Sequence, residues 1–194
     1  MSSRLYWTKK WIRELQANFF GPSVDRHQDF VIDKYTTAGT RDVDFHFTDA
    51  PDRRCVIDGE LISCSPKVAR DFYIDQIEKQ IVDSEAKTVL EAGCGTSINI
   101  FLLSQRLPDV EFRGVDITPD RIETGKKWFK EHKNFEPNVE VGDVTKLQFD
   151  ENEFDLVYSC HCFEQINQFS LAGVQELVRV AKKRIALLEP DYKN

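Results

Sequence analysis

The stretch 88–96, with the sequence TVLEAGCGT, holds the residues best suited to chemistry. Its apolar start predicts the end of a buried strand, and the apolar pattern from Ile98 onward predicts a helix. The turn between them contains Glu91, Gly93, Cys94 and Gly95. Glycine lets the backbone bend sharply and approach a ligand closely, and the first amides of a helix have no partner within it. The turn therefore predicts a ligand site made of free backbone N–H groups beside one carboxylate.

Polar residues also follow three later apolar runs, at 110–115, 139–141 and 154–158. Asp116 follows the first of these runs, with Ile117 next to it, and Asp143 follows the second, with Val144 next to it. Ser159, Cys160, His161 and Cys162 follow the third. Parallel strands end at one edge of a sheet, and ligands bind there, near the point where the strand order reverses. One acidic residue in such a place is as often a cap or a turn residue. Agreement among four strand ends predicts one shared site.

Asp116 lies about twenty residues beyond the glycine turn, where a carboxylate binds the ribose of a nucleoside. A nicotinamide dinucleotide is disfavoured, because Ile98 stands where its fingerprint needs a small residue and Glu91 would repel a pyrophosphate. A cationic ligand with an adenosyl group and an amino-acid tail fits better. We expect its ribose at Asp116, its amine near Glu91 and its carboxylate on the amides of 93–96.

These motifs resemble the class I S-adenosylmethionine-dependent methyltransferases. The matching segments are VLEAGCG at 89–95, GVDI at 114–117, GDV at 142–144, FDLVYSCHCFEQI at 154–166 and LLEP at 187–190. The resemblance covers about residues 65–194 and implies S-adenosyl-L-methionine as cofactor, with ribose at Asp116 and adenine between Asp143 and Val144. The cofactor-binding residues that it implies are Glu91, Gly93, Cys94, Gly95, Asp116, Ile117, Asp143, Val144 and Ser159.

The segment that starts at Ser159 is similar to the Ser-x-His-x-Leu-Glu-His-Ile pattern of small-molecule methyltransferases, which implies a small-molecule methyl acceptor. His161 is the candidate general base, because its ordinary pKa is near neutrality. The alternative role for His161 is to orient the cofactor or the loop. No metal site is expected, since the Cys-x-Cys spacing at 160–162 is not that of a structural zinc site.

Two other functions remain open at this point. The first is a non-catalytic adenosyl-binding subunit, or a truncated methyltransferase, that pairs with an active partner. It is suggested by the end of the sequence at Asn194, because family members continue past the strand at 185–188 with a helix and two strands. The second is a nucleotide-dependent oxidoreductase. An uncovered edge strand invites pairing, so we also expect a homo- or hetero-oligomer to cover it if the chain does not.

The elements expected to position the site form a doubly wound, Rossmann-like parallel α/β sheet in three layers. Its expected strands are 88–91, 110–115, 139–141, 154–158 and 185–188. Its expected helices start at Ser65-Pro66, at 97 and behind the Thr118 cap, and the last one carries Leu171 to Ala181. Residues 65–194 form this core, and residues 1–64 form an N-terminal helix and a small β elaboration.

Within residues 1–64, an amphipathic helix is expected at 3–20, to pack on the core or bind a membrane surface or partner. A strand is expected at 43–47 and a hairpin around Asp58-Gly59. Asp42, Asp44 and His46 would share one strand face, as metal ligands or as a solvated surface.

Composition restricts the partners of the protein. The balance of 26 basic against 33 acidic residues gives a net charge of -7, which disfavours nucleic acid as a partner. No apolar run reaches membrane-spanning length. Five cysteines without a CxxC pair predict reduced thiols and a cytoplasmic setting.

Overall fold

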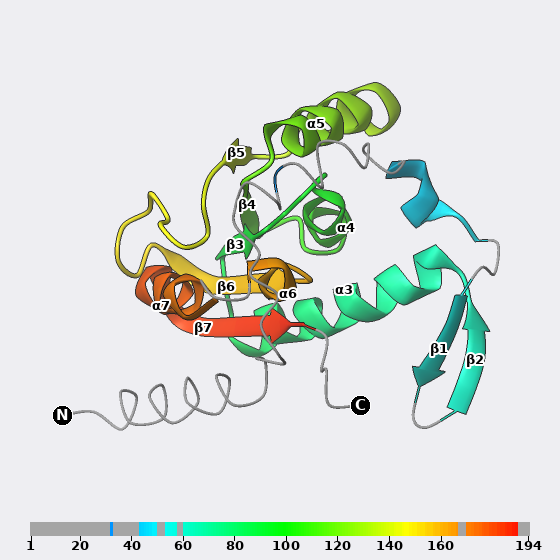
Figure 1. Cartoon of the computed structure of the whole chain (residues 1–194), viewed down its shortest axis with the longest axis horizontal. Coiled ribbons are helices and arrows are strands. Elements are labelled where there is room, and N and C mark those ends of the chain that lie inside the picture. The colour runs from blue at the N-terminus through cyan, green and yellow to red at the C-terminus, as the bar shows by residue number, and fades with distance from the viewer. Residues whose placement is uncertain (1–31, 33–42, 50–52, 58–59, 167–169, 190–194) are drawn as a thin grey trace.

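The computed structural model describes residues 32, 43–49, 53–57, 60–166 and 170–189 of the chain (Figure 1). The expected helix at 3–20, the hairpin turn at 58–59 and Asp42 lie outside these residues. The described elements are η1 (Val43–Phe47), β1 (Arg53–Ile57), β2 (Glu60–Cys64), α3 (Pro66–Asp83), β3 (Thr88–Ala92), α4 (Ile98–Arg106), β4 (Glu111–Asp116), α5 (Pro119–Lys133), β5 (Val139–Val141), β6 (Phe154–Cys160), α6 (Phe163–Ile166), α7 (Ser170–Val180) and β7 (Ala181–Leu188). None of the described helices is both long and apolar enough to cross a membrane.

Five parallel strands form the main sheet in the order β5-β4-β3-β6-β7. The chain proceeds from β3 toward one edge and then returns to build the other, so the order reverses between β3 and β6. Figure 1 shows β5 at one edge and β7 at the other. Ala92 at the end of β3 is level with Val115 of β4 and Ser159 of β6. The residues that follow these strands therefore leave the sheet side by side, and the predicted doubly wound fold is confirmed.

Helices cover both faces of the sheet and make three layers. On one face, the apolar sides of α3, α4 and α5 pack on the strands through residues such as Ile77, Leu103 and Ile122. On the other face, α6, α7 and the loop between β5 and β6 pack through Ile166, Leu177 and Leu147. The central strands β3 and β6 are buried on both sides, which explains why their sequences are continuous apolar runs.

The helix starts follow the expected capping residues in part. Ser65 caps α3, since its Oγ accepts a hydrogen bond of 3.1 Å from the Val68 amide, and Pro66 occupies the first turn. Thr118 stands at the cap of α5, but its side chain makes no cap hydrogen bond. Asp116 accepts the Thr118 amide instead, at 2.9 Å, so the start of α5 is fixed by a residue of the site.

β7 begins earlier than the apolar pattern suggests. Ala181 is the first residue of this strand rather than the end of the last helix, and 182–184 lie in the strand rather than in a turn. Asp155 holds this end of the sheet: its Oδ1 lies 3.1 Å from the Lys183 ammonium and its Oδ2 accepts the Lys87 amide at 2.8 Å. Burial alone would raise the pKa of Asp155, but these partners outweigh it and lower that pKa.

Residues 43–47 do not form the expected strand. They form the 3-10 helix η1, because Val43 is buried with Ile98 and Phe129, while Phe47 stacks on Trp128 with ring centroids 5.4 Å apart. The contacts of Val43 and Phe47 with α4 and α5 thus accompany a tight helix rather than an extended strand. Asp44 and His46 consequently do not share a strand face. The antiparallel hairpin of β1 and β2 is present.

The expectation that the thiols are reduced is correct for part of the chain. Cys94, Cys160 and Cys162 are free. Cys64, at the end of β2, is disulfide-bonded, so the expectation is wrong for this residue.

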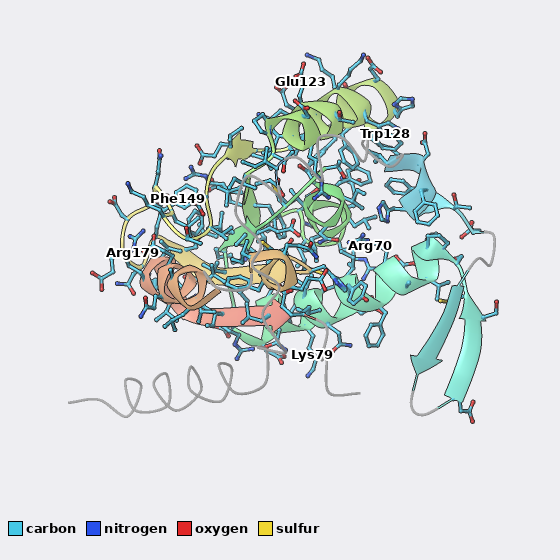
Figure 2. All side chains as sticks on the ribbon, in the orientation of Figure 1. Arg70, Lys79, Glu123, Trp128, Phe149 and Arg179 are labelled. Carbon is cyan, nitrogen blue, oxygen red and sulfur yellow. The ribbon has the colours of Figure 1, made fainter. Side chains whose placement is uncertain are left out.

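Arg179 of α7 fixes the loop that carries Asp143 and Val144. Its guanidinium donates to the carbonyls of Phe149 and Leu147 at 2.7 and 2.9 Å and to Glu176, whose other bond is to the Leu147 amide. Figure 2 shows Arg179 and Phe149 on the same side of the molecule.

We expect Arg179→Ala to lower the free energy of unfolding by about 1–3 kcal/mol, because the buried carbonyls lose their donors. Urea denaturation would measure the loss, with Lys182→Ala, an exposed position nearby, as the matched control. Equal midpoints for the two variants would show that Arg179 does not hold the loop.

Candidate functional site

The glycine turn after β3 is tied to β4 through its backbone. The amides of Gly93 and Cys94 donate to the Val115 carbonyl at 2.8 and 2.9 Å, and the Gly95 amide donates to Asp116 Oδ2 at 2.8 Å. Gly93 and Gly95 have φ of 81° and 54°, which glycine adopts without strain. The prediction of a row of free amides is wrong for these three residues, because the neighbouring strand uses them.

A cleft opens beside this turn at the carboxyl ends of β3, β4, β5 and β6. We call it the main cleft; it is lined by Gly93, Asp116, Ile117, Thr118, Arg121, Asp143, Val144, His161, Cys162, Gln165 and Ile166. The structure therefore brings together the predicted residues Gly93, Asp116, Ile117, Asp143 and Val144. The Arg121 side chain lies against Gly95 at the mouth of this cleft, whose free volume is about 50 Å³.

Asp116 is buried in the wall of the main cleft, with 5% of its surface exposed. Its two oxygens accept the amides of Gly95 and Thr118. Each carboxylate oxygen has a second lone pair, so both oxygens can also accept a ligand hydroxyl. Asp143 is held differently, since one oxygen, Oδ1, accepts both the Thr145 amide and the Thr145 hydroxyl, at 2.8 and 2.7 Å.

A second cavity adjoins the main cleft on the side of α3 and α4. We call it the polar chamber; it is lined by His46, Ala69, Arg70, Tyr73, Glu91, Gly93, Cys94, Thr96, Ile98, Asn99, Arg121, Cys160, His161 and Glu164, and its volume is about 310 Å³. The predicted residues Glu91 and Cys94 lie here. Gly93, Arg121 and His161 line both cavities, so the two lie side by side.

Glu91 is a buried carboxyl in the wall of the polar chamber. Asn99 donates to its Oε1 at 2.6 Å, and Oε2 lies against the Tyr158 hydroxyl without a hydrogen bond of standard geometry. Burial raises the pKa of Glu91 to about 7, although Asn99, Tyr158 and the charge of Arg70 favour ionisation. A cation in the polar chamber would stabilise the ionised form of Glu91, which burial disfavours.

Arg70 supplies a positive charge to the lining of the polar chamber. It projects from α3 toward α4 and η1 (Figure 2), where its guanidinium donates to Asn99 Oδ1 at 2.8 Å and lies 3.2 Å from His46 Nδ1. Arg70, Asn99 and Glu91 thus form one hydrogen-bonded row. The polar chamber presents a carboxylate and a guanidinium to the same ligand.

His161 stands where the cavities meet. Its backbone is left-handed, with φ of 57°, and its amide donates to the Leu188 carbonyl at 3.1 Å. The ring lies edge-on to Tyr73 with centroids 5.1 Å apart, and Nδ1 is 3.7 Å from Glu164 Oε1. These neighbours fix the direction of a half-exposed imidazole, which is what a residue that handles a proton needs.

Gly95, although it was predicted as a cofactor-binding residue, is not among the residues that line either cavity. Nor is Ser159. It is fully buried and donates to Glu189 Oε1 at 2.7 Å. Glu189 also accepts the Cys162 amide at 3.2 Å, so this pair fixes the segment that leads to α6. Burial raises the pKa values of the thiols of Cys94, Cys160 and Cys162, which keeps these groups neutral.

Arg70, Asn99 and Arg121 are site residues that sequence reasoning missed. Asn99 had a visible signal, because an amide among Ile98, Ile100 and Phe101 interrupts an apolar helix face. Arg121 follows a helix start and Arg70 precedes the core motifs, and neither spacing distinguishes them from surface arginines.

Sequence comparisons agree with this arrangement. The profile of the methyltransferase domain family matches residues 89–184, which include the glycine turn, Asp116, Asp143 and His161. The fold is an α/β domain with two cavities at the carboxyl ends of its parallel strands. The chain belongs to the class I S-adenosylmethionine-dependent methyltransferase family.

Individual relatives match parts of the chain. Ajmaline N-methyltransferase of Rauvolfia serpentina is 27% identical over 51% of this chain and 34% of its own length. Malonyl-[acyl-carrier protein] O-methyltransferase of Acetivibrio thermocellus is 32% identical over 60% of this chain and 40% of its own length. The matched part of the chain thus spans less than half of each of these relatives.

Among solved structures, magnesium protoporphyrin IX methyltransferase of Synechocystis PCC 6803 with bound S-adenosylmethionine superposes with a TM-score of 0.63. The two chains are 18% identical, and the superposed part covers 87% of this chain and 77% of the Synechocystis chain. At this identity the likeness concerns the fold alone.

Proposed function

We propose that this protein transfers the methyl group of S-adenosyl-L-methionine to a small-molecule acceptor by direct displacement. The observation that carries the proposal is that two cavities of different chemistry lie side by side. The main cleft has carboxylates placed for a nucleoside, and the polar chamber has Glu91 and Arg70 placed for an amino acid. A ligand that contains both parts, linked through one sulfur, spans the junction at Gly93 and His161.

The residues of the two cavities fit this cofactor group by group. Asp116 would accept the ribose hydroxyls, while Asp143 would accept the adenine amino group with Val144 against the ring. Glu91 would hold the ammonium. The carboxylate, which we expected on the amides of the glycine turn, would instead meet the guanidinium of Arg70, since those amides bond to β4. Arg121 and the segment around Cys162 must move apart for a nucleoside, because the free space is small.

The cofactor supplies an activated methyl group, so the protein needs to align the acceptor and to manage one proton. His161 is the group placed to do so. Glu164 lies near Nδ1, which favours the tautomer that leaves Nε2 free to accept a proton from an acceptor hydroxyl or ammonium. If the acceptor arrives deprotonated, the same contacts let His161 orient it.

Calorimetric titration tests the proposal. We expect S-adenosylmethionine and S-adenosylhomocysteine to bind with one site per chain and NAD to show no heat of binding. Methyl transfer to a panel of small acceptors would then be followed with a labelled methyl group. Binding of NAD in preference to both adenosyl ligands would overturn the proposal, and adenosyl binding without transfer to any acceptor would point to a non-catalytic subunit. The cytoplasmic setting and an oligomer that covers β7 stay predictions.

A further inference from the structure

A third cavity runs along the edge of the sheet, between α3 and β7. We call it the edge groove; it is lined by Phe72, Tyr73, Gln76, Gln80, His161, Ile185, Ala186, Leu187, Leu188 and Glu189, and its volume is about 530 Å³. This volume falls within the range of about 300–1,000 Å³ that small-molecule sites occupy. The groove is thus large enough for a ligand of its own.

The walls of the edge groove combine an apolar and aromatic part with four polar residues, Gln76, Gln80, His161 and Glu189. Phe72 is 47% exposed on α3, and on the opposite wall stand the aliphatic residues of β7. The charged side chains at the groove are paired only in part: Glu189 Oε1 accepts Ser159 and the Cys162 amide, while its buried Oε2 makes no hydrogen bond of standard geometry with the described residues, and Arg184 of β7 donates to Gln80. An anionic ligand would approach the Glu189 carboxyl with no lysine or arginine among the described lining residues.

His161 connects the edge groove to the other two cavities. It lines the main cleft, the polar chamber and the groove, and its ring touches Tyr73 of the groove wall. In the function proposed above, the main cleft and the chamber are filled by the cofactor. The groove is then a further cavity from which an acceptor can reach the methyl group beside His161.

We propose that the edge groove holds the methyl acceptor, and that this acceptor is an uncharged molecule with an apolar or aromatic body and a hydroxyl directed at His161. This inference rests on the proposed function. The body packs between Phe72 and the aliphatic side of β7, where burial of apolar surface supplies the affinity. The hydroxyl loses its proton to His161 as its oxygen bonds to the methyl carbon, and the carbon–sulfur bond breaks with its electrons left on sulfur.

The test uses 4-hexylphenol as a neutral probe and hexanoate as an anionic one, with binding followed by saturation-transfer NMR in the presence of S-adenosylhomocysteine. We expect 4-hexylphenol to bind and hexanoate not to bind. Phe72→Asp should weaken the phenol by about tenfold or more, because it places a charge in the apolar wall. Val82→Asp, a change at a position of the same helix that is 57% exposed and outside the groove, should leave the affinity within about twofold.

S-adenosylhomocysteine is titrated into the same variants, so that two kinds of failure are separated. If the unchanged protein did not bind S-adenosylhomocysteine, the proposed function itself would be wrong. Tight S-adenosylhomocysteine binding together with equal phenol affinity in the Phe72→Asp and unchanged proteins would sink only the groove assignment. Preferential binding of hexanoate would also contradict the groove assignment. So would a dimer, seen by sedimentation, that the Phe72→Asp change dissociates, because a second copy of the chain would then fill the groove.

Discussion

Asp116→Ala is expected to lower the affinity for S-adenosylhomocysteine by about 10- to 100-fold, which corresponds to roughly 1–3 kcal/mol. The change removes the acceptor proposed for two ribose hydroxyls. It also removes the partner of the Gly95 and Thr118 amides, so the glycine turn and the start of α5 lose the bond that joins them. Both effects act in the same direction, and isothermal titration would measure their sum.

Asp116→Asn separates the two effects, because an amide keeps one acceptor oxygen and the size of the side chain. We expect its affinity to fall between that of the alanine variant and the unchanged protein. Asp120→Ala is the matched control, since Asp120 is an exposed carboxylate in the first turn of the same helix. If Asp116→Ala bound as well as Asp120→Ala, Asp116 would not face the ligand.

The sequence was informative where local pattern and function coincide. Asp116 and Asp143 follow short apolar runs, and parallel strands align such positions whatever the detailed packing. The doubly wound parallel sheet, the Ser65 cap and the place of Asp116 could therefore be predicted. The glycines were also readable, because their positive φ is a local requirement of the turn.

The unpredicted features depend on contacts between distant segments. Arg70 reaches Asn99 across 29 positions of the chain, and no spacing rule relates residues on two packed helices. The η1 segment alternates like a strand, but burial of Val43 and stacking of Phe47 on Trp128 decide its conformation. The amides of the glycine turn looked free because a sequence does not show that the Val115 carbonyl lies opposite them.

Glu91 combines these local and distant influences, and its titration links stability to binding. The carboxyl follows a strand, as the sequence shows, but its environment comes from four other elements: Asn99 on α4, Tyr158 on β6, Arg70 on α3 and Asp116 on β4. The net result is a pKa of about 7, against 4.5 for a free glutamate, with burial as the main cause. A raised pKa in an acid means that the folded protein prefers the protonated form.

Two opposite pH dependences follow for the unliganded and liganded protein. Without ligand, the stability from protonated Glu91 is fully present below about pH 4.5 and is lost as the pH rises through about 7, a change on the order of 3 kcal/mol. Binding of an ammonium requires the ionised form. Affinity for S-adenosylhomocysteine should therefore rise by about a hundredfold from pH 5 to pH 8, since about one carboxyl in a hundred is ionised at pH 5.

Glu91→Gln should remove both dependences at once. The amide keeps an oxygen for Asn99 and carries no charge, so at pH 8 we expect higher thermal stability of the unliganded protein and weaker binding of S-adenosylhomocysteine. Its affinity should stay nearly level from pH 5 to pH 8, apart from the contributions of groups other than Glu91, which remain in both proteins and cancel in the comparison. A Gln variant that kept the steep rise in affinity would show that Glu91 does not cause it. If the rise is lost in the Gln variant, the ionised Glu91 carboxyl destabilises the unliganded protein and stabilises the bound ammonium.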